Sequence, residues 1–541
     1  MSSTPLRAAI LIVSTTAAKD PSADASESVL RNVFDSEEGK WQVVKTAIVP
    51  DVTTQIQRQL TSWSDGPEKV NLIVTTGGTG FAQGDDTPEA VAAVLHRPAP
   101  GLVHAMLSSS LAVTPYVSEA LALIEEHTPR PDVVVTKVGV GLVGSVLAED
   151  VIARENVPAF RASIVDGYAV VVPSDGNMKG IYPVTAVSHA APGEEKPLKE
   201  GEIARITTGA PLPIGATSVI MVEDTVLKSM TDDGTEEEEV EILAEGVKEG
   251  ENIREVGSDI KQGAKILSKG EKVSGVGGEL GLLAAVGVAE VKTYRRPIVG
   301  VLSTGDEIVE HDRPGDLRLG EVRDTNRITL MSAVRQWGFE AIDLGIARDK
   351  PGTLEQTLRD GLRRVDMIIT TGGVSMGELD LLKPTIERAL GGTIHFGRVN
   401  MKPGKPTTFA TVPVKTNSGE RIVKPIFSLP GNPASALVTF HLFVLPSLHH
   451  LSGESPAGVP SVPVTLSHDF PLDKGRPEYH RACISVGHDG RLSASSTGGQ
   501  RSSKVGSLKT ANALLCMPKG EGSMKKGNTV QALLIAPIQP S

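Results

Sequence analysis

The sequence predicts a multidomain protein of α/β and β parts in which one doubly wound α/β domain occurs twice. A chain of 541 residues is too long for one hydrophobic core, so three or more domains are expected. Four loops of small, basic or acidic residues follow apolar strands within residues 296–453, and ligands of open α/β sheets bind at such strand ends. The stretch DMIITTGGVSMG at 366–377 echoes NLIVTTGGTG at 71–80, which indicates the same strand, loop and helix unit used twice.

The later of these two stretches has the features of an anion site. Within residues 365–384 an apolar strand reaches a Gly-Gly pair and then a helix that begins near Leu381. Exposed N–H groups and the positive end of the helix dipole favour an anion at such a loop. Because the carboxylates of Glu378 and Asp380 would repel a bare anion, the pattern indicates a metal-bridged phosphate ligand. Taken alone, the stretch is also compatible with a purely structural glycine turn.

The other loops add cationic, acidic and hydroxyl groups to this one. Lys402 and Lys405 lie three apart on a loop that prolines stiffen, so two ammonium groups can converge on one anion. Ser435 offers a hydroxyl where a strand turns into a helix. Capping and turn stabilisation are the alternative roles for the acids of this region. The loops are VLSTGDEI at 301–308 with EVRDTNR at 321–327, VNMKPGKPTTFA at 399–410 and FSLPGNPASALVTF at 427–440.

These motifs resemble those of the MoeA-like molybdenum insertases and of their two-domain, gephyrin-type relatives. TGGVSMGELD, KPGKPT and LPGNPAS match the family's motifs at nearly every position, and the resemblance covers almost the whole chain. It implies a MogA-like doubly wound domain used twice, an elongated mixed subdomain, an inserted β-domain and a C-terminal β-barrel. The expected boundaries are 1–116 for a shortened MogA-like G domain, 117–173 with 251–295 for subdomain I, 174–250 for the inserted β subdomain II, 296–453 for subdomain III and 454–541 for the β-barrel subdomain IV.

The resemblance implies an enzyme that inserts molybdenum from molybdate into adenylylated molybdopterin and releases AMP. Molybdate is a tetrahedral dianion with the same needs as phosphate, so lysines, an arginine, hydroxyls and N–H groups should bind it. Asp306, Asp324 and Asp380 would hold Mg2+. Glu223 and Asp166 would also act in catalysis. The residues implied for molybdopterin and molybdate are Thr371, Gly372, Gly373, Ser375, Lys402, Lys405, Pro430, Gly431, Asn432, Ser435, Arg481, Ser502 and Ser503.

The N-terminal copy resembles the G domain, which adenylylates molybdopterin in this family, but it is shortened. Relatives run on through a further strand to an LPG turn and a closing helix, whereas here Val117 leads directly into the helix SEALALIEEH. We therefore expect little or no adenylyltransferase activity; an internal deletion, an altered splice form or a gene-model error are alternatives. Asp85 is also a candidate helix N-cap. The residues implied for pterin and Mg-ATP are Asp24, Ser26, Thr76, Gly77, Gly78, Thr79, Gly80 and Asp85.

Composition sets the remaining expectations. A net charge of -11 without a basic block argues against nucleic-acid binding, and two cysteines in so long a chain indicate a reducing compartment. The N-terminus lacks a secretory signal and no apolar run reaches membrane length, so we expect a cytoplasmic protein. The resemblance implies pterin, molybdate and nucleotide as its small-molecule partners. The resemblance also implies a homodimer. Two other classes stay open: a gephyrin-like scaffold that clusters partners, and a nucleotide-processing enzyme related to the CinA family, which would not need KPGKPT, LPGNPAS and VDGYA together.

Overall fold

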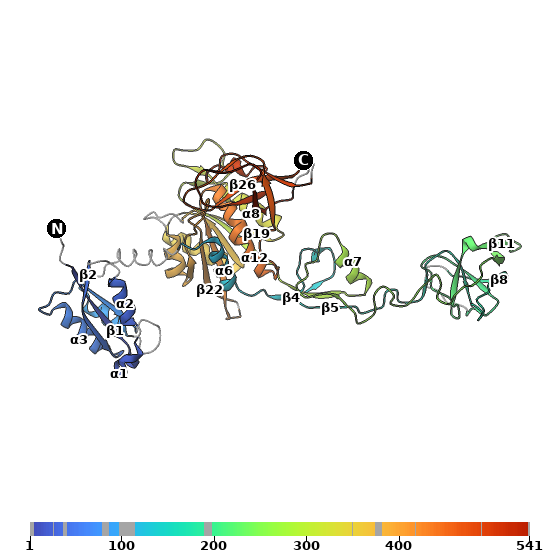
Figure 1. Ribbon diagram of the computed structural model, residues 1–541, viewed down its shortest axis with the longest axis horizontal. Helices are drawn as coiled ribbons and strands as arrows, with labels where there is room; N and C mark the ends of the chain where they lie inside the picture. Colours follow the sequence, from blue (N-terminus) through green and yellow to red (C-terminus); the bar gives the residue numbers. More distant parts are fainter. Residues whose placement is uncertain are drawn as a thin grey trace. The chain divides into compact units, whose positions relative to one another are not determined.

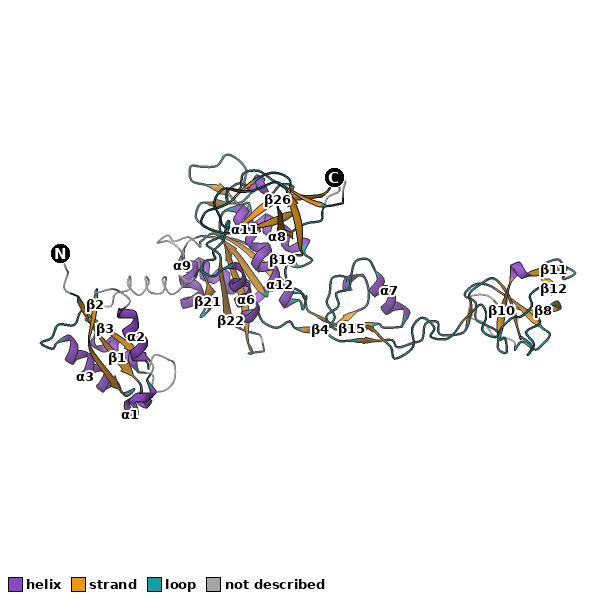
Figure 2. Cartoon of the chain, viewed as in Figure 1, coloured by secondary structure: helices purple, strands orange, loops and turns teal. Residues whose placement is uncertain are grey.

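The computed structural model divides the chain into two compact units, residues 1–110 and 111–541, and each is described by itself (Figure 1). Helices and strands alternate in the first unit and in the central part of the second, whereas strands and loops dominate around β8 and β10 (Figure 2). The predicted fold class, α/β and β in several domains, is confirmed. The structure describes residues 5–24, 26–35, 40–77, 86–96, 114–188, 197–348, 350–373, 381–416, 418–487 and 490–538.

The first unit contains a three-stranded parallel sheet in the order β2-β1-β3. Helix α2 covers one face, where Phe34 packs on Ile10 and Ile12 of β1. Helices α3 and α4 cover the other face, with Trp63 in the same cluster as Leu11. The elements are β1 (Leu6–Val13), α1 (Thr15–Lys19), α2 (Ser26–Asp35), β2 (Trp41–Val49), α3 (Thr53–Ser64), β3 (Leu72–Thr76) and α4 (Thr87–Val94).

The centre of the second unit is a six-stranded sheet in the order β19-β16-β20-β23-β22-β21. The strands from β19 to β23 run parallel, and β22 and β21 are antiparallel to their neighbours. Helices α8 and α11 pack on one face and α9 on the other. The elements are β16 (Ile298–Thr304), α8 (Asn326–Gln336), β19 (Glu340–Ala347), α9 (Pro351–Arg364), β20 (Met367–Thr371), α10 (Leu382–Pro384), β21 (Thr393–Phe396), β22 (Thr408–Lys415), β23 (Arg421–Leu429), α11 (Pro433–Thr439), η5 (Phe440–Val444) and α12 (Leu445–Leu451).

The two sheets repeat the same unit, as the sequence predicts. The order β2-β1-β3 corresponds to β19-β16-β20, and both copies turn at a glycine after the third strand. Gly77 and Gly372 each have a φ of +87°, and a Cβ there would lie 2.1 Å from the carbonyl oxygen of Val13 or 2.4 Å from that of Thr304. Only glycine fits either turn. Beyond β3, the described residues of the first unit contain no counterpart of β23, β22 and β21, and β3 is half-exposed whereas β20 is fully buried.

Around the central domain, the second unit is built from β-sheets. Short antiparallel pairs β15-β4, β14-β5 and β13-β6 are formed by strands before and after a six-stranded sheet in the order β10-β7-β9-β8-β12-β11, and β24-β27-β26-β28-β30 form a closed barrel. These elements are β4 (Val133–Lys137), β5 (Val151–Ile152), β6 (Ala162–Ser163), β7 (Gly167–Val170), β8 (Gly180–Ser188), β9 (Ile203–Ile206), β10 (Ser218–Met221), η3 (Val222–Asp224), β11 (Thr225–Met230), β12 (Glu237–Ile242), β13 (Ile253–Arg254), β14 (Lys265–Leu267), α7 (Gly278–Ala285), β15 (Glu290–Tyr294), β24 (Ser461–Leu466), β26 (Glu478–Val486), β27 (Leu492–Ser496), η6 (Val505–Leu508), β28 (Ala513–Met517) and β30 (Thr529–Leu534).

Two elements lie outside the subdomain to which the sequence assigns them. Helix α6 (Val117–His127), expected at the start of subdomain I, instead packs Ala120 and Ile124 into the core of the central α/β domain, against η5 and α12. Strand β7, expected before the inserted domain begins at 174, is hydrogen-bonded between β9 and β10 of that domain's sheet. Both differences arise because the partner of an amphipathic helix or of a short strand is set by tertiary packing.

The helix from Pro433 to Leu451 is long and apolar enough to cross a membrane by length and composition, with a mean hydropathy of 1.3. Its window is 78% buried inside the protein, and Phe440, Phe443 and Leu448 belong to the central core. Core helices pass the same test, so this feature is weak support for a membrane span.

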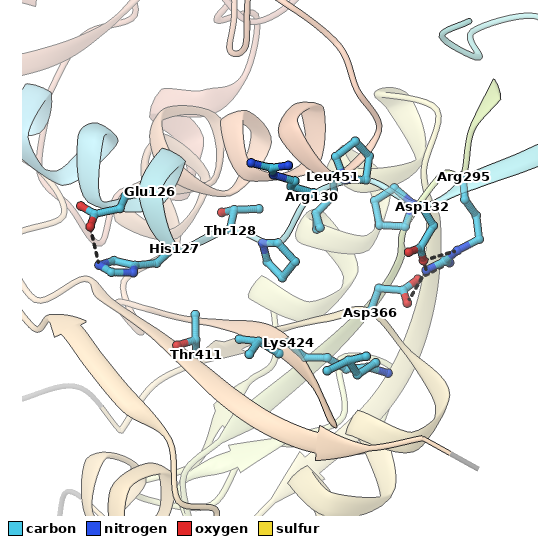
Figure 3. A pocket seen from close by; sticks show the side chains of 15 residues that line it. Glu126, His127, Thr128, Arg130, Asp132, Arg295, Asp366, Thr411, Lys424 and Leu451 are labelled. Carbon is cyan, nitrogen blue, oxygen red and sulfur yellow. Dashed lines mark hydrogen bonds and ion pairs between the residues drawn. The ribbon is translucent and has the colours of Figure 1, made fainter. Parts of the chain in front are cut away.

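At the amino ends of the central strands, an ion-pair cluster ties the β4-β15 pair to the α/β domain. Arg295 donates through both terminal nitrogens to the carboxylate of Asp366 (2.7 and 2.9 Å) and also binds Asp132 (3.0 Å). These residues line a cavity of about 610 Å³ (Figure 3). The cluster joins one end of the β4-β15 pair, where Asp132 precedes β4 and Arg295 follows β15, to Asp366 before β20, so it fixes where the pair leaves the domain. Ligands of such sheets bind at the opposite, carboxyl ends of the strands.

Asp366 makes the stability of this junction depend on pH. Burial acts to raise the pKa of its carboxyl, but hydrogen bonds from Arg295 and from the N–H of Ile298 hold the pKa below its ordinary value. Because the folded-state pKa is the lower one, the carboxylate contributes stability above the unfolded-state pKa, and this is lost as pH falls through the folded-state value.

Asp366→Asn should therefore lower the free energy of unfolding at pH 7 by about 1 to 3 kcal/mol, because Arg295 loses a charged partner. Below a pH of about 4 the difference from the unsubstituted protein should shrink, since protonation removes the same charge. Urea unfolding at pH 7 and pH 3 measures this, with the exposed Asp360→Asn as a control. A difference independent of pH would contradict the assignment.

Candidate functional site

A cavity of about 630 Å³ lies at the carboxyl ends of β16, β20 and β23. Residues after each of these strands line it, together with the start of α8 and one loop of the barrel. This is the position that the sheet topology predicts for a ligand. Of the residues that sequence and resemblance single out, the structure brings together here Asp324, Thr371, Gly372, Gly373, Pro430, Gly431, Asn432 and Ser503.

Two glycine-containing turns provide hydrogen-bond donors to the cavity. Gly372 donates its N–H to the carbonyl of Leu429, which joins the turn after β20 to the end of β23. The next N–H groups, those of Gly373, Gly431 and Asn432, have no acceptor among the described residues. Free N–H groups on adjacent turns that line one cavity are suited to bind the oxygens of an anion.

The start of helix α8 supplies a buried carboxylate. Asp324 is 4% exposed; its Oδ1 accepts the N–H of Arg327, and its Oδ2 has no hydrogen-bond partner. The Nε of Arg327 lies 3.6 Å from this Oδ2, within ion-pair range. Asn326 donates through Nδ2 to the carbonyl of Gly431 (2.8 Å), and its Oδ1 also lacks a partner. The cavity therefore contains two buried oxygens that can accept a cation or a donor from a ligand.

The barrel closes the cavity with the loop before η6. Ser503 lines the cavity, and the carbonyl of Ser502 accepts the N–H of Ala434 at the start of α11. Arg481 is fully buried and holds this loop from behind, because it donates to the hydroxyl of Ser507 (3.1 and 3.2 Å) and to the carbonyl of Arg501. Burial lowers the pKa of Arg481 to about 10, which still leaves it charged at neutral pH.

The predicted lysine pair does not converge in this cavity. The ammonium of Lys402 lies 3.1 Å from carboxylate oxygens of both Asp473 and Glu478, at the edge of a separate cavity of about 590 Å³. Lys405 is exposed, and its neighbour Pro406 lines the 630 Å³ cavity. Ser435, which we expected to face the ligand, is buried in α11 and does not line it.

Among the expected acids, only Asp324 lines the cavity within the described residues. Asp306 is exposed and does not line it, whereas its neighbour Glu307 does. Asp166 and Glu223 lie in the inserted β-domain, on adjacent turns joined by a hydrogen bond from the N–H of Val222 to the carbonyl of Asp166. The Thr208 N–H and hydroxyl bind the Asp166 carboxylate and lower its pKa. Ser375 and Asp380 lie outside the described residues.

In the first unit, Asp24 caps helix α2. Its carboxylate accepts the N–H groups of Glu27 (3.0 Å) and Ser26 (2.9 Å), and these hydrogen bonds lower its pKa. Thr76 ends β3, and Gly77 begins the turn after it. The hydroxyl of Thr87 donates to the carbonyl of Gly77 (2.9 Å) and so holds this turn to α4. The predicted Gly78, Thr79, Gly80 and Asp85 lie outside the described residues.

Sequence reasoning did not single out three residues that matter for the geometry. Asn326 lies two residues after Asp324 in EVRDTNR, and Glu307 directly follows Asp306. The sequence therefore marks both only as neighbours of predicted acids. Glu478 lies in RPEYHR, and its pairing with Lys402 joins positions 76 apart in the sequence. A motif search has no signal for such a pair.

Comparisons with known protein families match all parts of the chain. A model described as a probable molybdopterin binding domain matches residues 9–162 and 300–450. The MoeA N-terminal region (domain I and II) matches 116–287, and the MoeA C-terminal region (domain IV) matches 463–535. The first molybdopterin-domain match extends past the first unit, since residues 117–162 form α6 and strands of the second.

Relatives that span nearly the whole chain decide the family. The chain is 32% identical to gephyrin of Dictyostelium discoideum, over 91% of this chain and 88% of the relative. The chain belongs to the gephyrin-type molybdenum cofactor biosynthesis proteins. It is also 31% identical, over 94% of both proteins, to the molybdenum cofactor synthesis protein cinnamon of Drosophila melanogaster. A molybdopterin molybdenumtransferase of Haemophilus influenzae is 34% identical over 71% of this chain and 90% of its own length.

Solved structures agree with this family for the second unit. The crystal structure of a molybdopterin biosynthesis MoeA protein from Pyrococcus horikoshii superimposes with a TM-score of 0.62 at 28% identity. The superposition covers 78% of this chain and all of that one.

Proposed function

We propose that this protein inserts molybdenum from molybdate into adenylylated molybdopterin, with release of AMP, and that the 630 Å³ cavity is where this occurs. One observation carries the proposal: free N–H groups, a buried carboxylate and a barrel hydroxyl converge at the carboxyl ends of the strands. The relative from Haemophilus is named a molybdopterin molybdenumtransferase, which supports the reaction class. The thiolates that receive the metal belong to the pterin, so neither cysteine of the chain is needed.

Backbone N–H groups, a hydroxyl and an ammonium are the groups proposed to bind the oxyanion. The N–H groups of Gly373, Gly431 and Asn432 suit the oxygens of a phosphate or of molybdate, and the hydroxyl of Ser503 adds a further donor. Lys405 is the exposed ammonium nearest in sequence to the lining residue Pro406. Together these groups neutralise an oxyanion while the walls of the cavity exclude part of its water.

The cavity also fits a magnesium ion. Asp324 presents Oδ2, a buried oxygen without a hydrogen-bond partner, and hard divalent cations prefer carboxylate oxygens. Asn326 and Glu307 also line this cavity with side chains that carry oxygens. Asp380, which lies outside the described residues, is proposed as a further ligand. When bound, Mg2+ would offset the charge that develops on the phosphate as the adenylate is cleaved.

Asp324→Asn tests this assignment. The amide keeps the size of the side chain and the oxygen that caps α8 but discards the charge, so AMP release should fall at least about tenfold while the fold is retained. Release of AMP from adenylylated molybdopterin with molybdate is the measurement, and Asp316→Asn, an exposed acid of the same segment, is the control. If the variant released AMP at the rate of the unsubstituted protein, acids other than Asp324 would have to bind the metal.

We also propose that the first unit has little or no adenylyltransferase activity. It repeats only the β19-β16-β20 part of the central sheet in its described residues, and the turn that faces Gly372 in the central copy comes from the strand β23. The alignment with the Dictyostelium protein spans 650 positions, more than the length of this chain, so it contains long gaps on this side. A site that needs both turns would be incomplete.

Incubation of the purified protein with molybdopterin and Mg-ATP should accordingly give almost no adenylate. A complete two-domain relative serves as the positive control in the same assay. Turnover comparable to that control would show that the shortened unit still closes its site.

A homodimer in the cytoplasm completes the proposal, with nucleotide as a further small-molecule partner. Glu223 is exposed and does not line the cavity of its own chain, so it is available to reach the cavity of a second chain. Val140 and Val276, which are 89% and 95% exposed, offer apolar surface that an interface would cover.

Mixing two inactive variants tests the shared site. Glu223→Gln and Lys405→Ala chains should regain activity together, because one mixed dimer contains about one complete site. Insertion activity after co-expression is the measurement, and each variant alone is the control. No recovery in co-expressed mixed dimers would mean that each chain builds its site alone.

A further inference from the structure

Strand β26 of the barrel holds the loop that carries Lys402. The N–H of Lys402 donates to the carbonyl of Pro477 (2.9 Å), and the N–H of Tyr479 donates to the carbonyl of Lys402 (2.8 Å). The guanidinium of Arg476 donates to the carbonyl of Met401 (3.1 Å). These contacts join segments about 75 residues apart, so the barrel takes part in fixing the backbone of a loop that belongs to the α/β domain.

The side chain of Lys402 is held by the same part of the barrel. Its Nζ lies 3.1 Å from Glu478 Oε2 and 3.1 Å from Asp473 Oδ2. Asp473 is itself fixed, because its Oδ1 accepts the N–H groups of Gly475 and Arg476 at 3.0 Å. Glu478 is 4% exposed, and its Oε1 has no hydrogen-bond partner. The ammonium of Lys402 at 3.1 Å is its nearest positive charge, and the buried Arg481 adds a further electrostatic attraction.

This cluster is poorly suited to bind an oxyanion directly. Both carboxylates lie 3.1 Å from the ammonium of Lys402 and offset its charge, so little of that charge is left to attract molybdate or phosphate. Lys405, three residues on, is exposed, and no ion pair of the described residues involves it. The N–H of Val399 donates to the carbonyl of Lys405 (2.9 Å), so the position of Lys405 depends on the conformation of this loop.

We propose that Glu478 is a positioning residue for the oxyanion site. Glu478 and Asp473 together hold the ammonium of Lys402 in place. Through the backbone of residues 402–405, Glu478 thereby determines the position of the Lys405 ammonium. The inference rests on the proposed function in one respect, since it takes Lys405 as the ligand of the anion. Lys402 then acts through the loop and makes no contact with substrate.

The direction in which the KM for molybdate changes distinguishes this positioning role from direct binding of molybdate by Lys402. Glu478→Gln keeps the side-chain size and removes the charge, so the KM for molybdate should rise about tenfold with little change in kcat, and Glu478→Asp should recover part of the loss. If Lys402 bound molybdate itself, removal of a competing carboxylate would lower KM and overturn the proposal. Asp469→Asn is the control, because Asp469 lines the same 590 Å³ cavity but binds Lys525.

A double-substitution cycle tests whether Glu478 acts through Lys402. Lys402→Met should raise KM by a similar factor, and Glu478→Gln should add nothing further in that background. Additive effects of the two substitutions on KM would mean that Glu478 does not act through Lys402.

Hydrogen exchange at residues 399–407 gives a readout that does not need turnover. Exchange at the N–H groups of Val399 and Lys402 should be faster in Glu478→Gln and in Lys402→Met than in Asp469→Asn. If the unsubstituted protein inserted no molybdenum, the proposed function would be wrong, but hydrogen exchange would still test whether Glu478 orders this loop through Lys402. Unchanged exchange in both variants would overturn the positioning role of Glu478.

Discussion

The steric requirement at Gly372 is the constraint on which the site depends. The chain must turn at the end of β20 directly over the carbonyl of Thr304, where a Cβ would come within 2.4 Å of the oxygen. Because only glycine fits, the backbone passes close to the end of β16, and Gly373, the next residue, lines the cavity there. The N–H of Gly372 then binds the end of β23, so the ends of three strands share one edge around the cavity.

The same turn occurs in the first unit, at Gly77, but its surroundings differ. In the central copy β20 lies between β16 and β23 and is completely buried, whereas the counterpart β3 is only half-buried. A strand at a sheet edge leaves hydrogen-bonding groups and apolar side chains uncovered. The first unit therefore keeps the turn, while its described residues contain no counterpart of the segment that faces this turn in the central copy.

Local sequence predicts the features whose causes are local. The glycine turns and the internal repeat follow from residue type and spacing, and the barrel is implied by the motif resemblance, which covers almost the whole chain. What sequence could not predict depends on contacts between distant segments. Helix α6 has an apolar face, but only packing reveals that Ala120 meets the central core, and the choice of Glu307 over Asp306 depends on the direction in which a tight turn points each side chain.

The KPGKPT loop shows the same limit for function. Two lysines three residues apart are equivalent in a sequence, and both suggest an anion site. The structure distinguishes them because Glu478 of β26 and Asp473, which precedes this strand, lie beside Lys402, whereas no ion pair of the described residues involves Lys405. A lysine neutralised by carboxylates contributes order to a loop, whereas a lysine without them contributes charge to a ligand. Under the proposed role, the barrel therefore does more than cover the cavity, since its carboxylates would leave Lys405, and not Lys402, to meet the substrate.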